Sequence, residues 1–157
     1  MRKRGCFVLS FLLFLGVGAF CQEFDRIVDF EKTLKELSIE AAERPVGKVP
    51  PGKYLILEGL VSERWVIDPE PQTFIGEIEL VGGEWIGVEA VEMWNCIVQF
   101  TGPEFASRIP AGRTRKAAPD EIAINSQVLI AGRLVEIRNV NGKNVPVVAA
   151  THIRAIR

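Results

Sequence analysis

Residues 127–156, QVLIAGRLVEIRNVNGKNVPVVAATHIRAI, have the pattern of two β-strands folded back on each other. The flanking runs, 128–138 and 145–156, are rich in Val and Ile, which are enriched in strands. Asn141 and Gly142 lie between them, and this dipeptide tolerates the positive φ angles of a tight hairpin turn. The stretch therefore predicts a long antiparallel hairpin.

A matching strand is predicted upstream, over residues 53–68 (KYLILEGLVSERWVID). Gly59 interrupts this run, as Gly132 interrupts the first strand of the hairpin. A glycine inside a strand usually marks a bulge or a sharp bend. We expect both glycines to lie at strand bends or bulges, which let a long strand take part in both halves of a small barrel.

Residues 73–100 predict the strands between these two regions. A strand over 73–81 leads to Gly82-Gly83, which predicts a turn or bulge, and 84–91 continues the strand. Along 93–100, alternation places Trp94, Cys96, Val98 and Phe100 on one face, the better core candidate. Residues 101–109 then predict a short helix, and 110–121 a polar loop.

The N-terminal third divides into a leader and a tether. Residues 1–21 combine a basic start with an apolar run, which is typical of a cleaved secretory signal peptide, with cleavage expected after Ala19 or Cys21. Lipidation at Cys21 or an uncleaved anchor are the alternatives. Residues 22–52 predict a helix over 29–42 and a Pro-rich extended linker. The expected location is periplasmic or extracellular.

The charge balance disfavours binding to nucleic acid through phosphates alone. The 157-residue chain has a formal charge of -1. Loss of Arg2, Lys3 and Arg4 with the leader leaves 16 basic against 20 acidic residues, a charge of −4. Proteins that bind nucleic acid irrespective of sequence neutralise phosphates with Lys and Arg, so an acidic domain is poorly suited to that task.

The strand order of residues 53–157 resembles the oligonucleotide/oligosaccharide-binding (OB) fold. The resemblance is carried by YLILEGLV (54–61), NCIVQF (95–100), SQVLIAGRLVEI (126–137) and VPVVAATHI (145–153), and it points to the bacterial tRNA-anticodon-binding-like group. It implies an all-β, five-stranded Greek-key barrel with a short helix between the third and fourth strands, preceded here by the N-terminal helix. It also implies a ligand face on the second and third strands.

The sequence contains no pattern typical of catalysis. The single His152 and the expected buried thiol of Cys96 cannot build a metal cluster, and the alternating carboxylates, including Glu77 and Glu79, are typical of solvated strand faces. We expect no enzyme activity, cofactor or metal. The candidate ligand-binding residues are aromatic groups for stacking and basic groups for anions: Trp65, Trp85, Trp94, Arg64, Arg113, Arg115 and Lys116.

The function expected from these observations is an exported, non-enzymatic OB module that binds a protein or glycan partner in the cell envelope. The leader pattern and the acidic charge favour it. One alternative is binding of single-stranded nucleic acid, favoured by the fold and by the basic residues 113–116. The other is a structural envelope protein whose barrel supports oligomer assembly.

Overall fold

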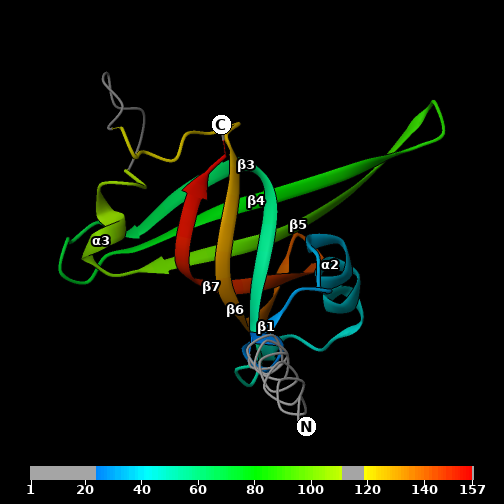
Figure 1. The fold of residues 1–157 in the computed structure, drawn as a ribbon, viewed down its shortest axis with the longest axis horizontal. Helices are drawn as coiled ribbons and strands as arrows, with labels where there is room; N and C mark the ends of the chain where they lie inside the picture. The colour runs from blue at the N-terminus through cyan, green and yellow to red at the C-terminus, as the bar shows by residue number, and fades with distance from the viewer. Residues whose placement is uncertain (1–23, 111–118, 157) are drawn as a thin grey trace, which may run out of the picture.

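The computed structural model describes residues 24–110 and 119–156. Five long strands form the body of the molecule (Figure 1): β3 (Tyr54–Asp68), β4 (Ile75–Ile86), β5 (Ala90–Thr101), β6 (Gln127–Val140) and β7 (Lys143–Ala155). β3 pairs in antiparallel fashion with both β4 and β6, and β5 pairs in parallel with β7. These pairings close the sheet into a five-stranded barrel. The predicted OB fold is confirmed.

Each of the two internal glycines lies where a neighbouring strand of the barrel comes close to the backbone. β3 changes its pairing partner next to Gly59, from β6 (through Leu60) to β4 (from Leu60 onward). A Cβ on Gly59 would lie 2.8 Å from a side-chain carbon of Leu80. Gly132 adjoins a register shift between β6 and β7, and a Cβ there would lie 2.5 Å from the carbonyl oxygen of Ala149. Figure 1 shows the resulting arch of β3. The predicted bulge is confirmed for Gly132, whereas Gly59 lies beside the change of pairing partner and has no register shift of its own.

The terminal hairpin turns where the sequence predicts. Asn141 and Gly142 have φ values of 52° and 83°. The side-chain oxygen of Asn139 accepts a hydrogen bond from the Gly142 N–H at 3.1 Å. The turn therefore fixes the register of β6 against β7.

β4 and β5 extend beyond the barrel as a projecting hairpin. β4 runs through Gly82-Gly83 without a break in register, and the chain turns instead near Gly87, whose φ is 66°. The predicted turn or bulge at Gly82-Gly83 was wrong, because both glycines are accommodated within a continuous ladder. Residues 82–94 pair only with each other among the strands that the structure describes. We call this segment the arm; it reaches away from the barrel in Figure 1.

Helix α2 (Leu34–Glu43) is the main N-terminal element. Thr33 caps it, and Glu36 completes a capping box, so the helix begins at residue 34 rather than at the predicted 29. Leu34 and Leu37 are buried in the core, and the helix packs against β5 and β7. No helix in the described part of the chain is long and apolar enough to cross a membrane.

The segments around α2 are tied to the barrel. β1 (Val28–Asp29) pairs with β3, and β2 (Gly47–Lys48) pairs with β6, so the predicted linker is partly strand. The short helix α3 (Pro103–Ala106) lies between β5 and β6, as predicted. Phe105 of α3 packs on Phe100, with ring centroids 5.1 Å apart, and both belong to the main core.

Candidate ligand-binding site

Two exposed tryptophans lie on the outer face of the sheet formed by β3, β4 and β5. Trp65 is opposite Glu77 in the β3–β4 ladder, and Trp85 is opposite Val91 in the β4–β5 ladder. The register of β4 is unbroken between Glu77 and Trp85, an even number of residues, so both tryptophans face the same side. We call this surface the tryptophan face.

The tryptophan face is long and its aromatic groups are accessible. Trp65 is 41% exposed and Trp85 is 70% exposed. Eight residues of strand separate Trp85 from the position opposite Trp65, which corresponds to about 26 Å at the rise of a β-strand. Near Trp85 the face continues with Val91 and Met93, which are both exposed. On the arm this face is therefore apolar, whereas the opposite face carries Glu84 and Glu92.

The third tryptophan does not belong to this surface. Trp94 is on the core side of β5 and is partly buried against the main core. The Lys35 ammonium of α2 lies 4.6 Å from the centroid of its ring, and the same lysine bonds Glu84 at 3.0 Å. Its side-chain contacts with α2 and the core identify Trp94 as a packing residue that joins the arm to the helix.

At the barrel end of the tryptophan face, acidic side chains accept hydrogen bonds from neighbouring side chains. Arg138 donates to both carboxylate oxygens of Glu77, at 3.0 and 3.1 Å, and Gln99 donates to Glu77 at 3.1 Å. Glu77 is only 6% exposed, which corrects the expectation of a solvated carboxylate. Hydrogen bonding to Glu77 and the negative charge of this carboxylate raise the pKa of Arg138 above its usual value, against the opposing effect of burial. Glu79 accepts from Asn95 at 2.8 Å and from the Ser62 hydroxyl.

The predicted basic residues are not gathered on the tryptophan face. Arg64 points to the other side of β3, where it donates to Glu121 at 2.9 Å and to the carbonyl of Ile122 at 2.8 Å. Both side chains of the Arg64–Glu121 pair are buried. Arg113, Arg115 and Lys116 lie outside the described residues.

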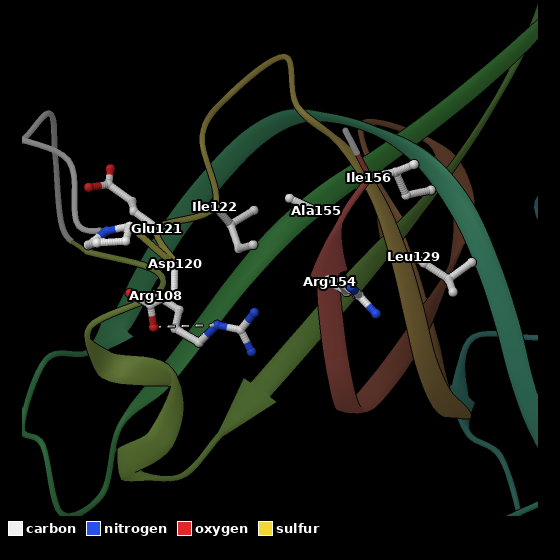
Figure 2. Close-up of a pocket in the computed structure, with 9 residues that line it drawn as sticks. Arg108, Asp120, Glu121, Ile122, Leu129, Arg154, Ala155 and Ile156 are labelled. Carbon is white, nitrogen blue, oxygen red and sulfur yellow. Dashed lines mark ion pairs between the residues drawn. The ribbon is translucent and has the colours of Figure 1, made fainter.

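A pocket of about 590 Å³ lies beside the Arg64–Glu121 ion pair, near the start of β6 and the end of β7 (Figure 2). Arg108 and Asp120 border it on the side of α3, and Arg154 borders it at the end of β7. Pro119, Ile122, Leu129 and Ile156 supply its apolar walls. Sequence reasoning missed Arg154, because an isolated arginine near the end of a strand carries no signal of its own.

The two residues with the most reactive side-chain types are not part of a site. Cys96 is a fully buried free cysteine, and burial raises the pKa of its thiol far above the usual value. His152 is exposed on β7. Within residues 24–110 and 119–156, no group of three or more His, Cys, Asp or Glu side chains is placed to hold a metal ion.

No model of a protein family matches the sequence, and no curated protein matches it. Solved structures with a similar fold include the protein PriB from Ralstonia solanacearum, with 14% identity, 66% of this chain and 97% of that chain covered, and a TM-score of 0.43. The small single-stranded DNA-binding protein from Streptomyces coelicolor has 12% identity, coverage of 66% and 91%, and a TM-score of 0.40. The Plasmodium falciparum SSB complex with ssDNA has 11% identity, coverage of 73% and 96%, and a TM-score of 0.42.

The expectation of an envelope module for a protein or glycan partner was wrong and is not retained. Of these three similar structures, two are described by their binding to single-stranded DNA, and none by an envelope partner. The physical reason for the error is that the expectation depended on the leader pattern and the net charge, and neither describes a binding surface. At these identities and TM-scores the likeness carries no functional argument, so the function below is argued from the chain's own residues.

Proposed function

We propose that this chain is a non-enzymatic protein that binds single-stranded nucleic acid on the tryptophan face. The observation that carries the proposal is the exposure of Trp65 and Trp85 on one side of the OB strands. Aromatic side chains on such strands provide stacking platforms for bases, since every base has a π-face. The separation of about 26 Å corresponds to about eight nucleotides at 3.4 Å per stacked base, within the site sizes of OB folds.

The same surface is expected to bind single strands in preference to duplexes. The apolar part of the face, around Trp85 and Met93, can contact unpaired bases, which a duplex keeps inside its stack. The carboxylates of Glu63 and Glu79 near Trp65 repel a dense array of phosphates. Binding is therefore expected to depend mainly on stacking and only weakly on salt.

A fluorescence anisotropy titration with labelled oligonucleotides, at low salt, tests the proposal. The Trp85→Ala protein should bind a 20-nucleotide single strand about 5- to 150-fold more weakly than the wild type, as expected for loss of one stacked base. Ile86→Ala is the matched control, because Ile86 is the exposed neighbour on the other face of the arm. Absence of binding by the wild type to both DNA and RNA single strands would refute the function.

Two finer expectations are retained as proposals. We propose that the barrel belongs with the tRNA-anticodon-binding-like group, on the sequence segments 54–61, 95–100, 126–137 and 145–153. We also propose export, on the pattern of residues 1–21, which lie outside the described residues. Intact mass spectrometry of the native protein separates cleavage after Ala19 or Cys21 from lipidation and from retention of the leader; retention without lipid would contradict cleavage.

A further inference from the structure

We propose that the pocket bordered by Arg108 and Arg154 binds a phosphate group of the nucleic acid strand, next to the Trp65 end of the tryptophan face. This inference rests on the proposed function and names the part of the site that takes the backbone charge. We call the pocket the phosphate pocket. It would supply the electrostatic attraction that the acidic barrel end of the tryptophan face lacks.

The position of the phosphate pocket follows from one ion pair. Arg64 immediately precedes Trp65 on β3, and its guanidinium is bonded to the side chain of Glu121 and to the carbonyl of Ile122. Glu121 and Ile122 both line the pocket. The pocket therefore lies next to the side chain that precedes Trp65 in sequence, on the other side of β3. A nucleic acid strand stacked on Trp65 would reach it by passing around the edge of β3.

The charge of the lining favours an anion. Glu121 is neutralised by Arg64 at 2.9 Å, so its carboxylate does not oppose an incoming phosphate. Asp120 is then the remaining carboxylate of the described lining, against the two guanidinium groups of Arg108 and Arg154. Arginine matches the geometry of phosphate oxygens and keeps its charge at all physiological pH values.

Both arginines have N–H groups without an acceptor among the described residues. Arg108 donates from Nη2 to the carbonyl of Ile153 at 2.7 Å, whereas its buried Nε has no hydrogen-bond partner. Its ion pair with Asp120 is long, with 4.0 Å between Nε and the carboxylate oxygen (Figure 2). A buried donor without an acceptor is costly, and an oxyanion in the pocket would satisfy it. Arg154 is exposed, and no hydrogen bond or ion pair holds its side chain in the described part of the chain.

The first test is the salt dependence of oligonucleotide binding by Arg154→Gln. Loss of one phosphate contact on a single strand should lower the slope of log affinity against log salt by about 0.7. The affinity at low salt should fall about tenfold, as expected for a charge-assisted hydrogen bond. Lys143→Gln is the matched control: it removes an exposed positive charge from the opposite end of the same strand, and it should leave the slope unchanged.

An unchanged slope in Arg154→Gln, together with weaker binding by Trp85→Ala, would overturn this inference and leave the proposed function intact. Equal loss of slope in Arg154→Gln and Lys143→Gln would also overturn it, because the effect would then be one of general charge. Comparing the affinities for 5′-phosphorylated and unphosphorylated strands shows whether the pocket binds a terminal or an internal phosphate. In both cases the loss of affinity in Arg154→Gln supports the pocket.

A second measurement tests the pocket without any oligonucleotide. NMR titration with inorganic phosphate should shift the guanidinium Nε–H signals of Arg108 and Arg154 in a saturable way, and Arg154→Gln should weaken the shift of Arg108. Unperturbed signals at high phosphate concentration would refute the pocket, even if the tryptophan face binds bases.

Discussion

Gly132→Ala should destabilise the barrel strongly, because β6 and β7 approach each other closely at this residue. An added Cβ would lie 2.5 Å from the carbonyl oxygen of Ala149 and 2.7 Å from a methyl carbon of Val148. Both neighbours belong to β7, and one of them is backbone, so neither can rotate away as the end of a flexible side chain could. The hairpin must open by several tenths of an ångström.

The expected cost follows from the behaviour of overpacked cores. Forcing an extra carbon into a close-packed region costs about 1–3 kcal/mol. We place Gly132→Ala at the upper end, about 3 kcal/mol, because a backbone ladder must shift at the register change beside it. For a domain of this size the melting temperature should fall by about 6–12 °C.

Urea denaturation followed by circular dichroism measures the effect. Gly52→Ala is the matched control, because nothing lies within 4 Å of an added Cβ there and its φ is not in the positive range. Its stability should change little or rise by about 0.5 kcal/mol, through the entropy of the unfolded chain. A Gly132→Ala protein as stable as Gly52→Ala would refute the close approach of β6 and β7, and with it the stated reason for glycine in this strand.

Three other predictions test the described interactions. Arg138→Met should lower the unfolding free energy in urea by about 2–3 kcal/mol, because it leaves the buried Glu77 carboxylate without its partly exposed cationic partner. The double variant Glu77→Leu/Arg138→Met should recover most of the loss, and a single variant within about 0.5 kcal/mol of the wild type would contradict this. Hydrogen bonding to Lys32 lowers the pKa of Glu40 below 4.5, so its stabilisation is present above that pH and is lost as pH falls through the folded-state pKa. Unfolding curves of wild type and Glu40→Gln should therefore converge in acid, and a constant difference from pH 7 to pH 3 would exclude the effect. Because burial raises the pKa of its thiol, Cys96 should resist iodoacetamide in the native protein and react after unfolding, as peptide mapping would show; rapid native labelling would place it at the surface.

The barrel was predictable from sequence because its signals are local and agree with one another. Asn141-Gly142 specifies a turn that needs positive φ, and Gly59 interrupts a β-rich run next to the residue where the strand changes partners. The alternation along 93–100 identified the core face of β5, where Cys96, Val98 and Phe100 are fully buried. Each of these features depends on neighbouring residues and on a period of two.

The arm and the pocket were not predictable in the same way. Gly82-Gly83 has the composition of a turn, but cross-strand pairing with Met93 and Trp94 keeps both glycines extended. The carboxylate of Glu77 resembles its solvated neighbours in sequence, and only the fold brings Arg138 to it from 61 residues away. Arg108 and Arg154 meet at one pocket for the same reason, since long-range pairing decides which ends of which strands come together.

Trp65, Trp85 and Trp94 were grouped as candidate ligand-binding residues by residue type alone, and the structure places only Trp65 and Trp85 at the surface. The position of Trp94 on the core side of β5 follows from the alternation that already assigned Cys96 to the core. Residue type thus indicates what a side chain can bind, whereas the strand period decides which side it faces.

The arm also divides the molecule into parts of unequal local stability. Residues 82–94 are held by one ladder and by the contacts of Lys35 and Trp94, whereas every strand of the barrel has two neighbours. Amide hydrogens near Gly87 should therefore exchange by local opening, while those of Ile78 and Val98 exchange only with global unfolding. Equal insertions into both strands of the arm would lengthen its reach without changing any pairing of the barrel. The reach of the proposed binding surface can vary independently of the fold that supports it.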